Sequence, residues 1–337
     1  MSTRILLTGA TGTVGREVLS RLCERQGNYA VTVFDKKTKY SKKILKKYAR
    51  CCRIIFGDIS VISDIREACA GQDAVIHLAA IIPPLADSNP ELAEKVNIRG
   101  TENIINCTGE LSPDAFFIYS SSISVYGDRN KDPWIRTDDP LQPSDRDEYA
   151  RTKIEAEKLV MNSGLKWTIF RLTAIMGVNN HKPSSLMFHM PLNTPMEIAT
   201  PRNTGDAFVK ALDHLDKLKG KVFNLSGGEQ CRIIYKDFLH KSFEIFGLGT
   251  PDFRENSFAR RNFHCGYYID GDLLDDIIDF RRDSMDDYFS MLKESVNPFR
   301  RRLTYLFRNT IKAKIQKQSE PLAAILSNNR ADIEHYF

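Results

Sequence analysis

The residues RILLTGATGTVGREVLSRL, numbers 4 to 22, decide the fold of this chain. The apolar run at 4–8 predicts a strand, and apolar residues at helical spacing predict a helix over 14–25. Gly9, Gly12 and Gly15 lie between them, where glycines let the backbone turn tightly and approach a pyrophosphate. The free N–H groups at the helix start then bind the phosphates. The stretch therefore predicts the first βα unit of a dinucleotide-binding fold.

The alternation continues along the chain. Further strands are predicted at 29–34, 53–56, 74–78, 115–119, 166–170 and 222–225, with helices at 41–50, 60–70, 90–107 and 147–161. Several of these strands are apolar throughout, which is typical of a parallel sheet covered by helices on both faces. We expect an α/β fold with a Rossmann-like, doubly wound parallel sheet and a smaller C-terminal substrate domain. Its parts are a dinucleotide-binding domain at 1–171, to which 201–228 return, a substrate domain from 172–200 and 229–296, and a tail at 297–337.

Composition narrows the class of protein. The chain has 337 residues, a net charge of +5 and 42% hydrophobic residues, which suits a globular protein and is too weakly basic to indicate a nucleic-acid partner. The first residues are too short an apolar run for a secretion signal, and no stretch approaches the roughly 18 apolar residues of a membrane span. The seven cysteines show no metal-ligand spacing. We interpret them as reduced thiols of a cytoplasmic protein and expect no metal.

Asp35 is expected at the end of the second strand, about twenty residues beyond Gly15. A carboxylate at that place can bind both ribose hydroxyls of an adenosine and would repel a 2′-phosphate, so the sequence favours NAD. Lys36 and Lys37 follow directly and could neutralise a phosphate, which leaves NADP open. An alternative is that Asp35 only caps a turn.

Ser122, Tyr149 and Lys153 form the predicted proton-transfer set. Ser122 ends a run of serines after the fifth strand, while Tyr149 and Lys153 stand four apart on one helix face. Oxidising a hydroxyl removes a hydride and a proton, and a tyrosine with a pKa of about 10 is a poor base unless a nearby ammonium lowers that pKa. Ser122 can hold the substrate oxygen at reacting distance. Each residue alone could be purely structural, but their joint occurrence after the glycine loop predicts catalysis.

At these residues the chain resembles the extended short-chain dehydrogenases/reductases, also called the NAD-dependent epimerase/dehydratase family. The resemblance covers about residues 1–228 and includes TGATGTVG (8–15), GDIS (57–60), HLAA (77–80), VNIRGTEN (96–103), SSSISVYG (120–127), YARTK (149–153), FRLTAIMG (170–177) and FNLSGGE (223–229). It implies that Ser122, Tyr149 and Lys153 are catalytic and that Asn97 supports them. We assign cofactor contacts to Gly9, Thr11, Gly12, Thr13, Val14, Gly15, Asp35, Asp58, Ile59, Leu78, Ala79, Ala80, Tyr149 and Lys153.

The reaction and substrate stay open. Dehydratases of the family carry Asp-Glu directly after the catalytic Ser/Thr, whereas this chain has Ile123 and Ser124, so dehydration is disfavoured. The leading hypothesis is a 4-epimerase-like enzyme of a nucleotide sugar, and the second is a dehydrogenase or reductase of a free sugar, sugar acid or steroid-like alcohol. A dinucleotide-sensing regulatory protein is the third, although a sensor needs no proton-transfer set. Residues 181–202 should line the substrate cleft, and Arg260 and Arg261 either bind a substrate diphosphate or lie at the surface.

The segment from 297 to 318 combines an apolar stripe with a basic surface. Phe299, Leu303, Leu306, Phe307, Ile311 and Ile315 recur at helical spacing beside seven cations, with no acid before Glu320. The pattern fits a helix packed on its own domain or on a partner subunit, a peripheral membrane contact, or nucleic-acid binding. A homodimer is expected.

Overall fold

A seven-stranded parallel sheet forms the centre of the computed structural model, which describes residues 2–25, 27–178 and 184–337. Its strands are β1 (Thr3–Thr8), β2 (Tyr29–Asp35), β3 (Cys52–Phe56), β4 (Ala74–His77), β5 (Phe116–Ser122), β7 (Lys166–Leu172) and β10 (Lys221–Leu225). The order across the sheet is β10-β7-β5-β4-β1-β2-β3, and every neighbouring pair is parallel. The predicted Rossmann-like fold is confirmed.

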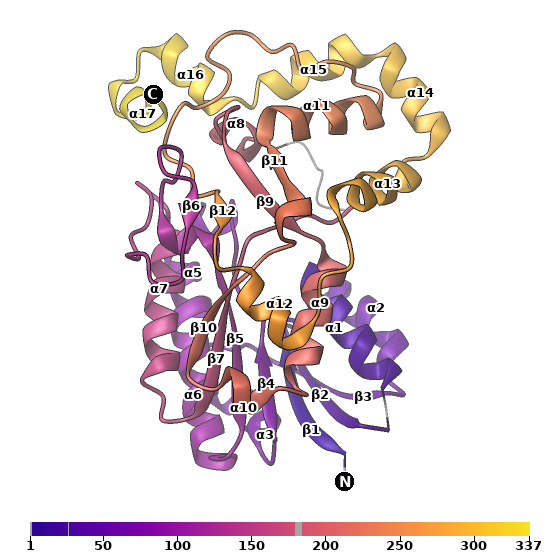
Figure 1. Cartoon of the computed structure of the whole chain (residues 1–337), viewed down its shortest axis with the longest axis vertical. Helices are drawn as coiled ribbons and strands as arrows, with labels where there is room; N and C mark the ends of the chain where they lie inside the picture. The colour runs from indigo at the N-terminus through magenta and orange to yellow at the C-terminus, as the bar shows by residue number, and fades with distance from the viewer. Residues whose placement is uncertain (1, 26, 179–183) are drawn as a thin grey trace.

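Helices cover both faces of this sheet (Figure 1). One face packs against α1 (Thr13–Glu24), α9 (Pro201–Ala211) and α12 (Asp272–Ile278), and the other against α3 (Ile62–Cys69), α6 (Gly100–Leu111) and α7 (Glu148–Met161). The shorter α2 (Lys39–Leu45), α4 (Leu85–Ser88), α5 (Pro90–Ala93) and α10 (Leu215–Leu218) complete the connections. The strand order reverses between β1 and β4, which makes the carboxyl edge of these strands the expected ligand site.

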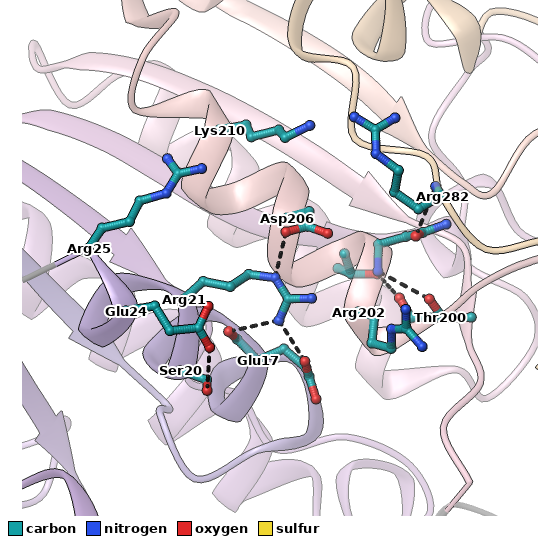
Figure 2. A network of polar contacts seen from close by, with 12 residues as sticks. Glu17, Ser20, Arg21, Glu24, Arg25, Thr200, Arg202, Asp206, Lys210 and Arg282 are labelled. Atoms are coloured by element: carbon teal, nitrogen blue, oxygen red, sulfur yellow. Dashed lines mark hydrogen bonds and ion pairs between the residues drawn. The ribbon is translucent and has the colours of Figure 1, made fainter. Parts of the chain in front are cut away.

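The contact between α1 and α9 is close because α9 carries Gly205 at the crossing. A Cβ on Gly205 would lie 2.6 Å from the Cβ of Glu17. Arg21 of α1 then binds both helices: its Nη1 lies 2.6 Å from Glu17 Oε2, and its Nε donates to Asp206 Oδ1 at 2.5 Å (Figure 2). This contact attaches the residues that return after 200 to the first βα unit.

A second layer lies over the carboxyl edge of the sheet (Figure 1). It holds a three-stranded sheet of β8 (Ala174–Ile175), β9 (Pro195–Ala199) and β11 (Arg232–Ile234), while β6 (Trp134–Ile135) pairs with β12 (Tyr267–Tyr268). Its helices are α8 (Leu186–His189), α11 (Tyr235–Phe246), α13 (Met285–Ser295), α14 (Pro298–Leu306), α15 (Arg308–Gln316), α16 (Glu320–Ser327) and α17 (Arg330–Tyr336). A separate apolar cluster that includes Phe188, Phe238, Phe243 and Tyr288 forms the core of this layer.

The structure corrects several details of the sequence analysis. Cys23 and Cys51 form a disulfide, so the interpretation that all seven cysteines are reduced is wrong. The thiols therefore no longer support a cytoplasmic location. No local pattern indicates this pair, because the two cysteines lie 28 positions apart along the chain. The end of α1 and the turn before β3 bring their Cα atoms to 5.7 Å.

Two predicted helices are also divided. The helix expected over 90–107 is α5, a π-helical segment at Glu94–Arg99 and α6 in succession. The tail contains separate helices α14 and α15 rather than one stripe over 297–318. Within the described parts of the chain, every helix is too short or too polar to cross a bilayer.

Candidate active site

The glycine loop lies at the carboxyl end of β1 and is packed backbone against backbone. Gly9 has φ of +70°, and a Cβ there would lie 2.7 Å from the nitrogen of Ala79. The nitrogen of Gly12, which precedes α1, donates to the carbonyl of Gly9 at 3.1 Å. A Cβ on Gly15 would lie only 2.1 Å from that same carbonyl oxygen. The loop therefore needs glycine at two positions to keep the helix start open to a pyrophosphate, and these residues fit a dinucleotide.

Asp35 ends β2 beside this loop. Its Oδ2 accepts a hydrogen bond from the nitrogen of Thr11 at 2.9 Å, and its Oδ1 accepts one from the nitrogen of Lys36 at 2.8 Å. The Lys36 ammonium lies 3.9 Å from Asp58. Hydrogen bonds from Ser60 lower the pKa of Asp58. Lys36 therefore lies beside a carboxylate that offsets its charge, which favours NAD over a cofactor with a 2′-phosphate.

Replacing Asp35 by alanine should raise the Kd for NAD about tenfold and reduce the protein's preference for NAD over NADP. A tenfold change corresponds to about 1.4 kcal/mol, the scale of the ribose hydrogen bonds that the carboxylate would make. Calorimetric titration of both cofactors measures the effect. Asp73→Ala is the matched control, since Asp73 pairs with Arg4 at the opposite edge of the sheet. Unchanged affinity for both cofactors would show that Asp35 only shapes the turn.

The remaining predicted cofactor residues line the same edge. Thr13 and Val14 begin α1, while Leu78, Ala79 and Ala80 follow β4 and are partly buried. The nitrogen of Ala79 donates to Thr8 Oγ1 at 3.3 Å, so this segment lies directly against the loop. Ile59 is buried and contacts the start of α6, where a Cβ on Gly100 would lie 2.7 Å from the Ile59 side chain.

Ser122 at the end of β5 lies near Tyr149 and Lys153 in the first turns of α7. A hydrogen bond with Ser122 is one of the contacts that act on the Tyr149 phenol. Lys153 is buried and donates to the carbonyl of Ser120 at 2.6 Å and to Tyr119 Oη at 3.3 Å. Its ammonium lies 5.8 Å from the centre of the Tyr149 ring. The structure thus groups the three predicted catalytic residues, and it adds Tyr119, which the sequence analysis did not single out.

The pKa values of Lys153 and Tyr149 show what the protein itself contributes to proton transfer. Burial lowers the pKa of Lys153 to about 7, and Glu157 one turn further along α7 acts against that shift. Burial also raises the pKa of Tyr149, while the hydrogen bond with Ser122 lowers it. Oxidised NAD would supply a hydride acceptor and a positive charge at this place. The protein positions the phenol and a titratable ammonium, and the phenolate needs that additional charge to form near neutral pH.

A chain of hydrogen bonds connects the glycine loop to the catalytic helix. Thr101 Oγ1 donates to the carbonyl of Asn97 at 2.6 Å, so it accepts from His77 Nε2 at 2.9 Å, and His77 Nδ1 then accepts from Thr8 at 2.7 Å. Burial lowers the pKa of His77 to about 3, which keeps the ring neutral. The sequence analysis did not identify His77, Thr8 or Thr101 as parts of the site.

Asn97 lies in the π-helical segment and is buried. Its amide accepts from the nitrogen of Ile81 at 2.7 Å and donates to the carbonyl of Ile81 and to Thr152 of α7, both at 2.9 Å. It therefore fixes the segment after β4 against the turn of α7 between Tyr149 and Lys153. The resemblance implies a supporting role for Asn97, and with these contacts that role stays a prediction.

Arg171 of β7 forms an ion pair with Glu157 of α7. Its guanidinium pairs with Glu157 at 2.8 Å and donates to Tyr126 Oη at 2.7 Å, and both charged side chains are buried. A buried, hydrogen-bonded pair of this kind fixes the helix in one position.

A cavity of about 890 Å³ lies above the catalytic helix, between the sheet and the second layer. It reaches Asp147, which caps the start of α7, and Asp87, which accepts a hydrogen bond from the nitrogen of Tyr149 at 3.3 Å. Its apolar wall consists of Met176, Leu186, Met187, Met190, Tyr235, Phe238, Leu239, Phe243, Phe246, Leu248, Phe263, Ile311 and Ile315. The cavity is therefore large and mostly apolar, as substrate sites commonly are, and it extends to the start of α7, although Ser122, Tyr149 and Lys153 are not among its described lining residues.

The expected substrate residues are only partly in this wall. Residues 184–187, His189 and Met190 contribute to it, whereas His181, Lys182 and Pro183 lie outside the described residues. Arg202 pairs with Asp283 and is not among the described residues that line the cavity. Arg260 donates to Asn256, and both Arg260 and Arg261 are exposed beside the C-terminus and also outside that wall. The contributions of α11, α15 and Asp87 were missed, because no local pattern connects them.

A doubly wound sheet with a glycine loop and a Ser–Tyr–Lys set at its carboxyl edge is the arrangement of the short-chain dehydrogenases/reductases. A family model described as the NAD dependent epimerase/dehydratase family matches residues 5–194, more than half of the chain. The chain belongs to this family, which confirms the resemblance.

The curated relatives that resemble the chain include hydroxysteroid dehydrogenases. The chain is 30% identical to 3 beta-hydroxysteroid dehydrogenase type 7 of Rattus norvegicus over 162 residues, which are 47% of this chain and 48% of that protein. It is 26% identical to a 3-beta-hydroxysteroid dehydrogenase of Mycolicibacterium neoaurum over 276 residues, 74% of this chain and 72% of that one. The chain spans about half the length of the mammalian relatives it matches.

Among solved structures, a short-chain dehydrogenase/reductase superfamily protein from Agrobacterium tumefaciens with bound NAD gives a TM-score of 0.66 at 21% identity, covering 90% of this chain and 99% of that one. A dTDP-glucose 4,6-dehydratase from Streptomyces venezuelae with bound NAD gives 0.70 at 18% identity, covering 87% and 96%. At these identities the likeness shows the shared fold.

Proposed function

We propose that this protein is an NAD-dependent dehydrogenase or reductase of a bulky, largely apolar secondary alcohol. The observation that carries the proposal is the apolar cavity, which extends to Asp147 at the start of α7 and to Asp87, the acceptor of a hydrogen bond from the Tyr149 nitrogen. Tyr149 would exchange the hydroxyl proton, Ser122 would hold the substrate oxygen, and Lys153 would favour the phenolate. The similarity to hydroxysteroid dehydrogenases of rat and Mycolicibacterium neoaurum supports an alicyclic alcohol.

The charges of the cavity wall argue against a nucleotide sugar, which the sequence analysis placed first. The described lining residues include four carboxylates, Asp87, Asp145, Asp147 and Glu320. Arg146 is the one arginine among them, and it already pairs with Asp332 at 2.8 Å and lies 3.8 Å from Asp145. Three lining histidines, His189, His264 and His335, also contact these carboxylates. Among the described lining residues, a diphosphate would therefore meet carboxylates, apolar side chains and basic groups that already have acidic partners.

A panel of substrates tests the proposal. The purified protein with NAD should oxidise hydroxysteroids and other alicyclic secondary alcohols, measured as NADH absorbance, and should interconvert no UDP-hexoses. The active alcohols should also raise the melting temperature, because they bind the folded state. Met190→Glu, which adds a carboxylate to the apolar wall, should raise KM for the best alcohol at least about tenfold.

Met161→Glu is the matched control, since Met161 is exposed at the end of α7 and outside the cavity wall. The proposal would be overturned if the protein, with retained NAD, epimerised a UDP-hexose and oxidised none of the apolar alcohols. That result would restore the nucleotide-sugar hypothesis. Equal KM values for Met190→Glu and the native protein would show that the cavity does not bind the substrate.

A further inference from the structure

Helix α14 and the residue after it expose a band of large apolar side chains. Phe299 is 71% exposed, Leu306 67% and Phe307 60%, and Leu303 and Tyr305 are exposed beside them. Phe299, Leu303, Leu306 and Phe307 recur at helical spacing and therefore share one face, whereas the scattered single apolar residues of an ordinary surface need no explanation. The patch belongs to no part of the core, because none of the residues of α14 is buried.

Helix α14 contacts the rest of the protein through the backbone and side chain of Arg301, and not through its large apolar side chains. The carbonyl of Arg301 lies so close to Gly247 that a Cβ there would be 2.6 Å from it, and Arg301 Nε donates to the carbonyl of Ile245 at 3.1 Å. The following helix α15 does pack inward, since Ile315 is buried and Ile311 lies against the same core. The apolar stripe expected from the sequence is thus divided: α15 covers core, and the large apolar side chains of α14 are exposed.

Cations surround the exposed patch. Residues 297–319 contain seven lysines and arginines and no acid. Lys312 pairs with Asp252, and Arg308 lies over the Tyr305 ring at 4.3 Å. Among the residues that the structure describes, no carboxylate forms an ion pair with Arg300, Arg302, Lys314 or Lys317, and all four side chains are exposed. The surface therefore presents free positive charge next to aromatic and aliphatic side chains.

We propose that α14 and the first residues of α15 form a docking surface for an anionic lipid bilayer. Apolar side chains of a surface helix can enter the headgroup region while neighbouring cations bind acidic lipids, and binding needs both contributions. Charge decides against a second copy of this chain as the occupant, because two such surfaces would bring like charges together. Figure 1 shows α14 and α15 along the outer edge of the second layer, far from β1 and the sheet, where a flat surface can reach them.

The position of the docking surface has a consequence for substrate entry, which rests on the proposed function. Thr304 of α14, together with Ile311 and Ile315 of α15, belongs to the wall of the apolar cavity. A bilayer bound at α14 therefore lies next to the cavity, and an apolar alcohol dissolved in that bilayer has a short path to it.

Cosedimentation of the full chain with vesicles tests the docking surface without any measure of activity. The protein should pellet with phosphatidylcholine vesicles that contain about 30% phosphatidylserine, and binding should fall at least about tenfold when salt rises from about 50 mM to about 500 mM. Phosphatidylcholine alone should bind little. Because no substrate is involved, the result is independent of the proposed function.

Two sets of surface variants separate the contributions. The triple variant Phe299→Ser, Leu306→Ser, Phe307→Ser and the double variant Arg300→Glu, Arg302→Glu should each weaken binding at least about tenfold without lowering the melting temperature. The matched controls are Val61→Ser with Ile62→Ser, which are 41% and 51% exposed, and Lys217→Glu with Lys219→Glu on and beside α10, at the opposite end of the molecule. The controls should bind as the native chain does.

Absence of binding to acidic vesicles would overturn the proposal, as would equal binding by the variants and their controls. Gel filtration supplies a further readout. A native dimer that the triple variant converts to a monomer, without any vesicle binding, would assign the patch to self-association and overturn the lipid surface as its occupant.

Discussion

Tyr149→Phe is expected to lower kcat at least about a hundredfold while leaving the fold and NAD binding nearly unchanged. The substitution removes only the hydroxyl that hydrogen-bonds with Ser122 and would exchange the substrate proton. Loss of a general acid–base group typically costs about 10² to 10⁴ in rate. The ring itself remains, so its packing beside Lys153 should persist. Steady-state kinetics with the best substrate and calorimetric titration of NAD measure the two quantities separately.

Tyr29→Phe is the matched control for this change. Tyr29 begins β2, at the edge of the sheet opposite the site, and its hydroxyl donates to Asp213 at 3.3 Å. It should retain kcat. A Tyr149→Phe enzyme with near-native kcat would remove Tyr149 from the mechanism, and loss of NAD binding along with kcat would show that the variant had lost structure rather than a proton carrier.

The sequence identifies the cofactor edge well because its determinants are local. Gly9, Gly12 and Gly15 lie within one turn and one helix start, and their close backbone contacts follow from the absence of side chains. Tyr149 and Lys153 are one helical turn apart, so their common face also follows from spacing. Ser122 is the exception, because it joins them only through the pairing of β5 in the sheet, which the regular alternation of strands and helices made predictable.

The cavity could not be predicted in the same way. Its wall is assembled from segments as distant as Asp87, Met187, Phe238 and Ile315, and each of these residues has an ordinary role in its own helix. Only the packing of the second layer on the sheet brings them together. The sequence analysis ranked nucleotide sugars above free sugars, sugar acids and steroid-like alcohols on family motifs alone, and no motif indicates that carboxylates and apolar groups share one wall.

The disulfide and the tail show a related limit. Cys23 and Cys51 are far apart in sequence, and no pattern around either one indicates its partner. In the tail, the helical spacing of apolar residues is real, but spacing alone does not tell which part of a stripe faces the core. Ile315 is buried and Phe299 is exposed because the chain bends at Phe307, between α14 and α15.

Gly15→Ala should abolish measurable NAD binding, raising its Kd at least about a hundredfold, and should also lower the melting temperature. A Cβ at Gly15 would meet the Gly9 carbonyl oxygen at 2.1 Å and the Ala10 Cα at 2.8 Å, and these backbone atoms cannot move without opening the loop. Gly109→Ala is the matched control, since no heavy atom lies within 4 Å of its Cβ position in α6. There alanine should stabilise the helix slightly, by up to about 1 kcal/mol.

Gly12→Ala separates damage to the loop from damage to the cofactor site. Its Cβ would lie 3.3 Å from the Gly9 oxygen, and Gly12 is exposed with an ordinary φ of −68°. The protein alone can accept this methyl group if the Gly9 oxygen shifts by a few tenths of an ångström, so the melting temperature should fall much less than in Gly15→Ala. A dinucleotide lying on the helix start cannot accept it equally well, so the Kd for NAD should still rise about tenfold. If Gly12→Ala bound NAD with native affinity and Gly15→Ala lost only stability, the loop would be a tight turn and not the binding site of the pyrophosphate.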